Sequence, residues 1–305
     1  MYTKPLGNII QTHGLDHHLY ADDSQSYMAF RPTDDAGATE VLTRVETCLA
    51  AIRKWMGNNM LKVNDGKTEV ILFASKHNAK IMDPVKVLVG DVLVQSVPVV
   101  RDLGVMLDTN MSMEKHINTV CKSAYFQLRK ISHIRRSLTE TATKTLIHAL
   151  VTSRIDYCNA LLHGLPKRLL QKLQRVQNAA ARIVTKTSRR HHITPVLKEL
   201  HWLPVEYRIR YKVLVHTYRA LHDLSPVYIK NLLCRHETSR LLRSQSTLQL
   251  TVPRTRTATY GDRSFQASAP MLWNKLPCLL KCATTLDAFK KALKTNLFTE
   301  AYDAH

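Results

Sequence analysis

Two hydrophobic patterns alternate in the first third of the chain. Between residues 41 and 56 the apolar positions recur every three or four residues, which predicts an amphipathic helix that ends at Gly57 and Asn58. Short alternating or β-branched runs at 61–63, 68–73, 85–94 and 103–107 predict strands, with turns at 64–66 and 90–91. Residues 1–30 predict an extended lead, a loop at 13–14, and a strand, turn and strand around Asp22 and Asp23. We therefore expect an α+β region of short antiparallel sheet with one packed helix.

From residue 112 onward the hydrophobic period becomes helical almost throughout. One helix is predicted over 117–131, the next is capped by Thr139 or Thr141, and Pro166 begins another whose apolar stripe extends to Val184. Tyr207, Tyr211, Leu214, Tyr218 and Leu221 follow at helical spacing, and such an aromatic stripe usually belongs to a core. Two closing helices are predicted over 265–276 and 286–297.

Three regions follow from these patterns: 1–110, 111–192 and 193–305. The last contains a polar, basic and poorly periodic stretch at 235–264, which we interpret as a linker or a nucleic-acid-binding loop, with a possible short strand at 248–252. The fold class expected is α+β, with the sheet confined to the first region and helices in the other two.

Charge separates the first region from the rest. The 305 residues carry a formal net charge of +20. Residues 1–110 hold 11 Lys and Arg against 13 Asp and Glu, whereas residues 111–305 hold 33 against 11. A concentrated positive field of this kind indicates a polyanionic partner, with nucleic acid first, because Lys and Arg contacts to phosphate dominate non-specific affinity.

The sequence argues against several other classes. It has no apolar run of transmembrane length and no signal-peptide pattern, so we expect a nuclear or cytoplasmic protein that is neither secreted nor bound to a membrane. Its 6 Cys are widely scattered, which favours reduced thiols over a disulfide framework. Cys278 and Cys282 resemble half of a zinc site, but no matching second pair follows.

Two adjacent carboxylates, Asp22 and Asp23, stand between an apolar approach and an apolar exit. Phosphoryl and nucleotidyl transfer are commonly catalysed by Mg²⁺ bound by one or two carboxylates and by substrate phosphates. On these residues alone, Asp-Asp-Ser is more often only a polar turn, because these side chains hydrogen-bond their own backbone. The residues alone leave a metal site and a simple turn open.

Longer motifs surround this turn. Met1-Tyr2-Thr3-Lys4-Pro5-Leu6-Gly7 through Tyr20-Ala21-Asp22-Asp23 resembles the reverse transcriptase of non-LTR (LINE-type) retrotransposons, in particular their Jockey-like group. Leu61-Lys62-Val63-Asn64-Asp65-Gly66-Lys67-Thr68-Glu69 is similar to the next palm motif of that family, and Leu103-Gly104-Val105-Met106-Leu107-Asp108 to its primer grip. Leu173-Gln174-Arg175-Val176-Gln177-Asn178-Ala179-Ala180-Ala181-Arg182 and Leu200-His201-Trp202-Leu203-Pro204 are similar to the region after the palm.

The resemblance implies an RNA-directed DNA polymerase with an RNA template, a DNA primer and Mg²⁺ or Mn²⁺. It implies that Asp22 and Asp23 are catalytic metal ligands, that Lys67 protonates or positions the leaving pyrophosphate, and that Gly104 lies close to the primer. A solvated turn lysine is an equal alternative for Lys67. The family also needs an Asp on an earlier strand and a nucleotide-binding segment, both of which would precede Met1. We therefore expect the C-terminal part of the enzyme, a partial palm and a helical thumb, to be inactive alone.

Basic residues of the second region lie largely off the apolar stripes, with few acids among them, which favours a phosphate-binding surface. The residues expected to bind nucleic acid there are Lys122, Arg129, Lys130, Arg135, Arg136, Lys167, Arg168, Lys172, Arg175, Arg182, Lys186, Arg189 and Arg190. Arg208, Arg210, Lys212 and Arg219 are expected to extend this surface. Two other hypotheses stay open: a non-enzymatic nucleic-acid-binding protein derived from a retroelement, and a translated fossil without a selected function.

Overall fold

The structure, a computed structural model, describes residues 4–31, 35–75, 77–81, 83–236 and 248–303. The chain divides into two compact units, Met1–Met111 and Ser112–His305. The division lies one residue from the change of pattern predicted at 110/111, whereas the predicted division at 192/193 falls inside the second unit. Each unit is described by itself.

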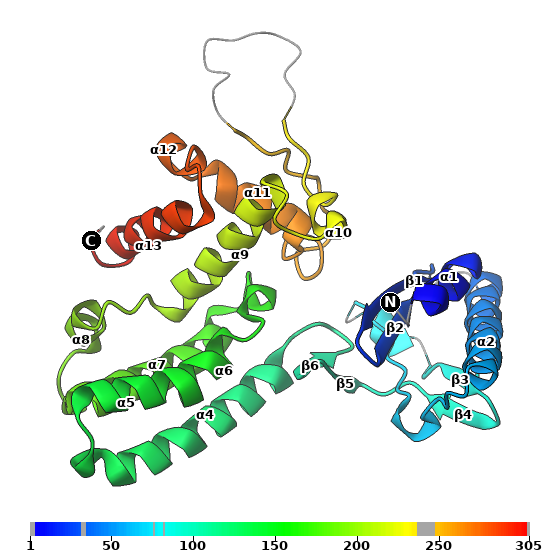
Figure 1. Ribbon diagram of the computed structural model, residues 1–305, viewed down its shortest axis with the longest axis horizontal. Helices are drawn as coiled ribbons and strands as arrows, with labels where there is room; N and C mark the ends of the chain where they lie inside the picture. Colours follow the sequence, from blue (N-terminus) through cyan, green and yellow to red (C-terminus); the bar gives the residue numbers. More distant parts are fainter. Residues whose placement is uncertain (1–3, 32–34, 76, 82, 237–247, 304–305) are drawn as a thin grey trace. The chain divides into compact units, whose positions relative to one another are not determined.

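The first unit combines helices with three hairpins (Figure 1). Its elements are α1 (Lys4–Thr12), β1 (Asp16–Tyr20), β2 (Asp23–Tyr27), α2 (Asp35–Asn58), the 3₁₀ turn η1 (Asp65–Lys67), α3 (Asn78–Ile81), β3 (Lys86–Val89), β4 (Val92–Gln95), β5 (Val99–Asp102) and β6 (Val105–Asp108). The sheets are antiparallel and two-stranded, and they pair β1 with β2, β3 with β4, and β5 with β6. Mixed α and β structure is confirmed here, although the short sheet that we predicted is three separate hairpins.

Two predictions for the first unit were wrong. The lead expected to be extended is helix α1, because Leu6 and Ile10, one helical turn apart, are buried in a core with Leu15 and Cys48. Residues 61–63 and 68–73 were expected to be strands, but they are irregular around η1. The side chains of 70–73 are partly or largely exposed, so the apolar run does not occupy a buried sheet face.

The second unit is helical, as predicted. Its elements are α4 (Glu114–Ile134), η2 (Arg135–Ser137), α5 (Glu140–Ile147), the π-helical turn η3 (His148–Thr152), α6 (Ser153–Asp156), η4 (Asn159–Leu162), α7 (Lys167–Thr185), α8 (Ile193–Glu199), α9 (Val205–Leu221), α10 (Val227–Lys230), α11 (Phe265–Asn274), α12 (Cys278–Lys281) and α13 (Leu286–Tyr302). Thr139 caps α5 by accepting a hydrogen bond from the Ala142 amide. Of the two predicted caps, Thr139 and Thr141, the structure therefore shows Thr139. The strand predicted at 248–252 is a single bridge between Arg235 and Leu250, and residues 237–247 of the predicted linker lie outside the described residues.

The aromatic stripe of α9 is core, as predicted. Tyr218 stacks on Phe289 of α13 with ring centroids 4.4 Å apart, and Trp273 of α11 lies against the same Phe289 ring. All three side chains are fully buried. Figure 1 shows α9 beside α11 and α13, so the end of the chain packs back onto the middle of the unit.

Helices α4 and α7 pack against each other and run in the same direction. Near their starts, the Lys172 ammonium lies 3.3 Å from a Glu114 carboxylate oxygen and 2.8 Å from Asn118 Oδ1. Near their ends, the Arg135 guanidinium donates to the carbonyls of Ile183 and Val184, both at 2.7 Å. These carbonyls belong to the last turn of α7, whose acceptors have no partner within the helix. Arg135 therefore fixes the register of α4 on α7.

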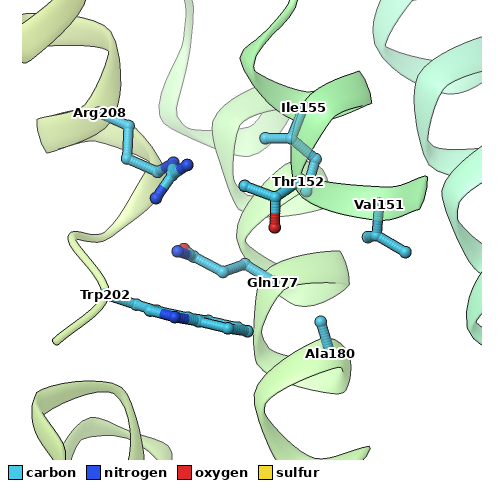
Figure 2. Close-up of a pocket in the computed structure, with 7 residues that line it drawn as sticks. All are labelled: Val151, Thr152, Ile155, Gln177, Ala180, Trp202 and Arg208. Carbon is cyan, nitrogen blue, oxygen red and sulfur yellow. The ribbon is translucent and has the colours of Figure 1, made fainter. Parts of the chain in front are cut away.

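A small cavity lies where η3, α7 and α9 meet (Figure 2). The centre of a water molecule can occupy about 10 Å³ of it. It is lined by Val151, Thr152, Ile155, Gln177, Ala180, Trp202 and Arg208. Gln177 Oε1 and Trp202 Nε1 are buried there without a hydrogen-bond partner in the described part of the chain. A space of this size admits no more than about one water. This cavity is therefore too small for a ligand larger than water.

The contacts of Arg135 predict a stability effect that its neighbour Arg136 does not share. Arg135→Lys removes the planar fork that reaches three carbonyls, including Leu138 O at 2.8 Å, and leaves partly buried acceptors unpaired. We expect the free energy of unfolding of the helical unit to fall by about 1–3 kcal/mol. Urea unfolding followed through tryptophan fluorescence measures it, in a Trp55→Phe background that leaves Trp202 and Trp273 of the helical unit as the emitters.

The matched control is Arg136→Lys, because the Arg136 side chain is exposed. It should leave the unfolding midpoint of the helical unit unchanged. An equal loss of unfolding free energy in both variants, or no loss in Arg135→Lys, would contradict the proposed capping of α7 by Arg135.

Candidate nucleic-acid interface

The hairpin of β1 and β2 presents Asp22 and Asp23 at its tip. This confirms the strand, turn and strand predicted around the two residues. Tyr20 pairs with Asp23, so Ala21 and Asp22 form a two-residue turn. Ala21 has a φ of 54°, in the left-handed region that a residue with a Cβ rarely adopts. Both carboxylates are exposed. The turn therefore displays the two acids to solvent at some cost in backbone strain.

Asp102, which the sequence motifs do not include, lies beside this hairpin. The Gln25 side-chain amide donates to Asp102 Oδ1 at 2.5 Å. Burial raises the pKa of Asp102, and the nearby Asp23 carboxylate raises it further. Asp23 and Gln25 share one face of β2, so this face meets the end of β5. The only signal for Asp102 in the sequence is its place directly before Leu103-Gly104-Val105.

The described donors do not fit a complete metal site. No group of three His, Cys, Asp or Glu side chains in the described ranges is placed to hold an ion. Asp102 is near Asp23, but one of its oxygens is already bonded to Gln25. Lys67 is exposed in η1 and has no hydrogen bond or ion pair to Asp22 or Asp23 among the described residues. We derive no catalytic step through Mg²⁺ or Mn²⁺ from this arrangement.

The raised pKa of Asp102 predicts how the first unit responds to acid. A carboxyl group with a raised pKa binds its proton more tightly in the folded state than in the unfolded chain, so its ionised form destabilises the fold above that pKa. We expect Asp102→Asn to slow hydrogen exchange of the β1, β2, β5 and β6 amides at neutral pH. Acidification should raise the protection of these amides, corrected for the intrinsic exchange rate at each pH, in the parent chain and have a smaller effect in the variant.

Asp91→Asn is the control, because it removes the same charge from the exposed turn between β3 and β4. It should leave these exchange rates as they are. Faster exchange in Asp102→Asn at neutral pH would show that the Asp102 carboxylate stabilises the hairpins.

Helix α4 carries a line of cations opposite its buried face. Its buried side chains include Ile117, Ala124, Leu128 and Ile131. Lys122 and Arg129 are exposed and seven residues apart, which places them on one face, and Arg136 continues the spacing into η2. The Lys130 ammonium lies 4.5 Å from the ring centroid of Phe126 at the edge of this line.

Helix α7 carries a second line beside the first. Arg168 and Arg175 are exposed and also seven residues apart. Partial burial raises the pKa of Tyr125 on α4, and the nearby Cys121 raises it further. The positive charge of Arg175 lowers the same pKa, which shows that the Arg175 guanidinium lies near Tyr125. Because α4 and α7 run parallel, and Arg168 and Arg175 lie near Glu114 and Tyr125 of α4, the two lines lie side by side. We call Lys122, Arg129, Lys130, Arg136, Arg168 and Arg175 the α4–α7 basic surface.

Several predicted binding residues have structural contacts instead. Arg135 holds the end of α7, the Arg182 guanidinium donates to the carbonyls of Ser188 and His191, and Lys172 bonds Glu114 and Asn118. Arg168 also lies near Glu114, at 3.5 Å.

The side chains of Lys167, Lys186, Arg189 and Arg190, which were also predicted to bind nucleic acid, are exposed. Gly104 lies in the first unit, in the turn between β5 and β6, with a φ of 86°.

Three of the four α9 cations predicted to extend this surface, Arg208, Arg210 and Arg219, have structural contacts instead, and the fourth, Lys212, is half-buried. Arg208 makes a two-point ion pair with Asp156, and Arg210 makes one with Glu300, with nitrogen–oxygen distances of 2.6 and 3.0 Å in the second pair. Arg219 donates to the Leu224 carbonyl at 3.1 Å. These side chains hold α9 to α6, to α13 and to its own end.

Comparison with protein-family models, with curated proteins and with solved structures finds no match to this chain. In the described ranges, no helix combines the length and the apolar character needed to cross a bilayer.

Proposed function

We propose that this chain binds nucleic acid through the α4–α7 basic surface of its helical unit. The observation that carries the proposal is the pair of parallel cation lines, side by side on packed helices. Apart from Arg168 with Glu114, the six residues of the surface have no ion pair among the described residues. Phosphates that replace the counterions of such a surface supply non-specific affinity and make it depend on salt.

We further propose that the chain is the C-terminal part of a non-LTR retrotransposon reverse transcriptase. The motif resemblance supports this origin, and in that setting the first unit is a partial palm, the α4–α7 region is the thumb, and the bound nucleic acid is the RNA template, the DNA primer or another nucleic acid. The hydrogen bond from Gln25 to Asp102 supports it too, because it brings the strand that follows the Asp22-Asp23 turn to the segment beside the motif that resembles the primer grip.

Binding without polymerisation is the activity that we propose for this chain by itself. Asp22 and Asp23 are two carboxylates on one exposed turn, and a nucleotidyl-transfer site built around Mg²⁺ or Mn²⁺ would need a further donor to complete it. The described residues therefore support a non-enzymatic nucleic-acid-binding protein without requiring a further metal ligand.

The proposal predicts the effect of neutralising the surface. The triple variant Lys122→Gln, Arg129→Gln, Arg175→Gln should weaken binding to duplex and single-stranded oligonucleotides alike, because each cation contacts phosphate. The slope of log affinity against log salt should become shallower by about 0.7–0.9 for each phosphate that the variant no longer neutralises. Fluorescence anisotropy titrations at several salt concentrations measure both.

The control is Lys275→Gln, Lys291→Gln, Lys294→Gln, which removes the same charge from exposed positions outside the α4–α7 basic surface. It should retain most of the affinity, as should Asp22→Ala. Equal losses of affinity in the two triple variants would show that binding depends on the net charge of the chain and not on the α4–α7 basic surface. Mg²⁺-dependent primer extension that Asp22→Ala abolishes would overturn the proposal that the chain binds without polymerising.

A further inference from the structure

Two aromatic rings are exposed within the α4–α7 basic surface. Tyr125 is 43% exposed and Phe126 is 54% exposed, whereas the apolar residues on the other side of α4 are almost completely buried. The packing of the helical unit does not account for these rings, since neither belongs to its buried core. Large apolar side chains that are exposed next to one another indicate a contact surface.

The rings lie on either side of the cation line of α4. Lys122 is three residues before Tyr125 and four before Phe126, and Arg129 is four and three residues after them. Residues at these spacings are neighbours on a helix surface. Each ring therefore has a cation one turn before it and another one turn after it.

A further cation lies near each ring. The Lys130 ammonium lies over the Phe126 ring at 4.5 Å from its centroid. Arg175 from α7 lies close enough to Tyr125 to act on its pKa. Flat apolar faces thus alternate with cations across the two helices.

This alternation matches the chemistry of a single strand better than that of a duplex. A duplex presents phosphates to the protein and keeps its base faces stacked inside, so a ring on the protein surface adds little to the contact. A single strand presents a charged backbone and free base faces, and exposed aromatic rings beside cations are the features that bind both. Stacking tolerates any base, because every base has a π face.

We propose that Tyr125 and Phe126 stack on unpaired bases of a single-stranded nucleic acid whose backbone follows the cations of the α4–α7 basic surface. This inference rests on the proposed function, since it assigns the class of nucleic acid to the same surface. The proposal applies to RNA and DNA, because it uses only base faces and phosphates.

The test compares normal and abasic single strands of equal length on the full chain. Abasic strands keep the phosphates and lack the bases, so the ratio of the two affinities isolates stacking. We expect the parent chain to bind the normal strand at least about 10-fold more tightly than the abasic one. The double variant Tyr125→Leu, Phe126→Leu should lose most of that ratio and keep the salt dependence, while Tyr125→Phe should keep both.

Three outcomes would overturn the inference. The first is equal binding of normal and abasic strands by the parent chain with a steep salt dependence, which leaves the proposed function intact. The second is absence of salt-dependent binding to any strand, which removes the proposed function as well. The third is an unchanged ratio in the leucine variant accompanied by loss of self-association in sedimentation, which would assign the rings to a contact between copies of the chain. Circular dichroism and thermal unfolding establish that the variants are folded.

Discussion

The parallel packing of α4 on α7 is the constraint on which the helical unit depends. Apolar faces of the two helices are buried together, and Arg135 closes the end of α7 by donating to two of its terminal carbonyls. Once these faces are buried and the register is fixed, the remaining charged positions of both helices are exposed on the surface beside the seam. The same packing that stabilises the unit therefore brings two lines of cations together.

The basic residues of the helical unit divide into two groups by what they contact. Arg135, Arg182 and Arg208 donate to backbone carbonyls or to a carboxylate and so hold helices together. Lys122, Arg129 and Arg175 are exposed, and gathering them on one surface costs self-repulsion that the fold itself does not offset. A polyanion would relieve that repulsion, which gives the surface a physical reason to bind one. The cluster is therefore more consistent with binding than with solubility alone.

Periodicity predicted the elements that bury a continuous stripe and missed those that depend on distant partners. Helices α2, α4, α7 and α9 and the β3–β4 hairpin could be derived because their own sequences alternate or repeat at the right spacing. Helix α1 was missed because its two buried residues, Leu6 and Ile10, are too few to distinguish a helix from an extended lead. The strands expected at 61–63 and 68–73 failed for the opposite reason, since their apolar runs have strand propensity but little burial.

The candidate sites show the same limit. The exposed turn of Asp22 and Asp23 could be located from the sequence, but its neighbour Asp102 is 79 residues further along the chain than Asp23 and is reached only through the fold. Spacing placed the basic residues of α4 off its apolar stripe, but it could not tell that Arg135 has structural contacts or that Tyr125 and Phe126 are exposed beside Lys122 and Arg129. Those facts depend on which face of α4 meets α7.

Lysine acetylation footprinting of the full chain, with and without a single-stranded oligonucleotide, tests most directly whether nucleic acid binds on α4 and α7. We expect bound nucleic acid to slow acetylation of Lys122 and Lys130 several-fold and to leave acetylation of Lys275, Lys291 and Lys294 unchanged. Protection that is uniform across these lysines, or that spares Lys122 and Lys130 while the oligonucleotide is bound, would contradict the placement of the interface on α4 and α7.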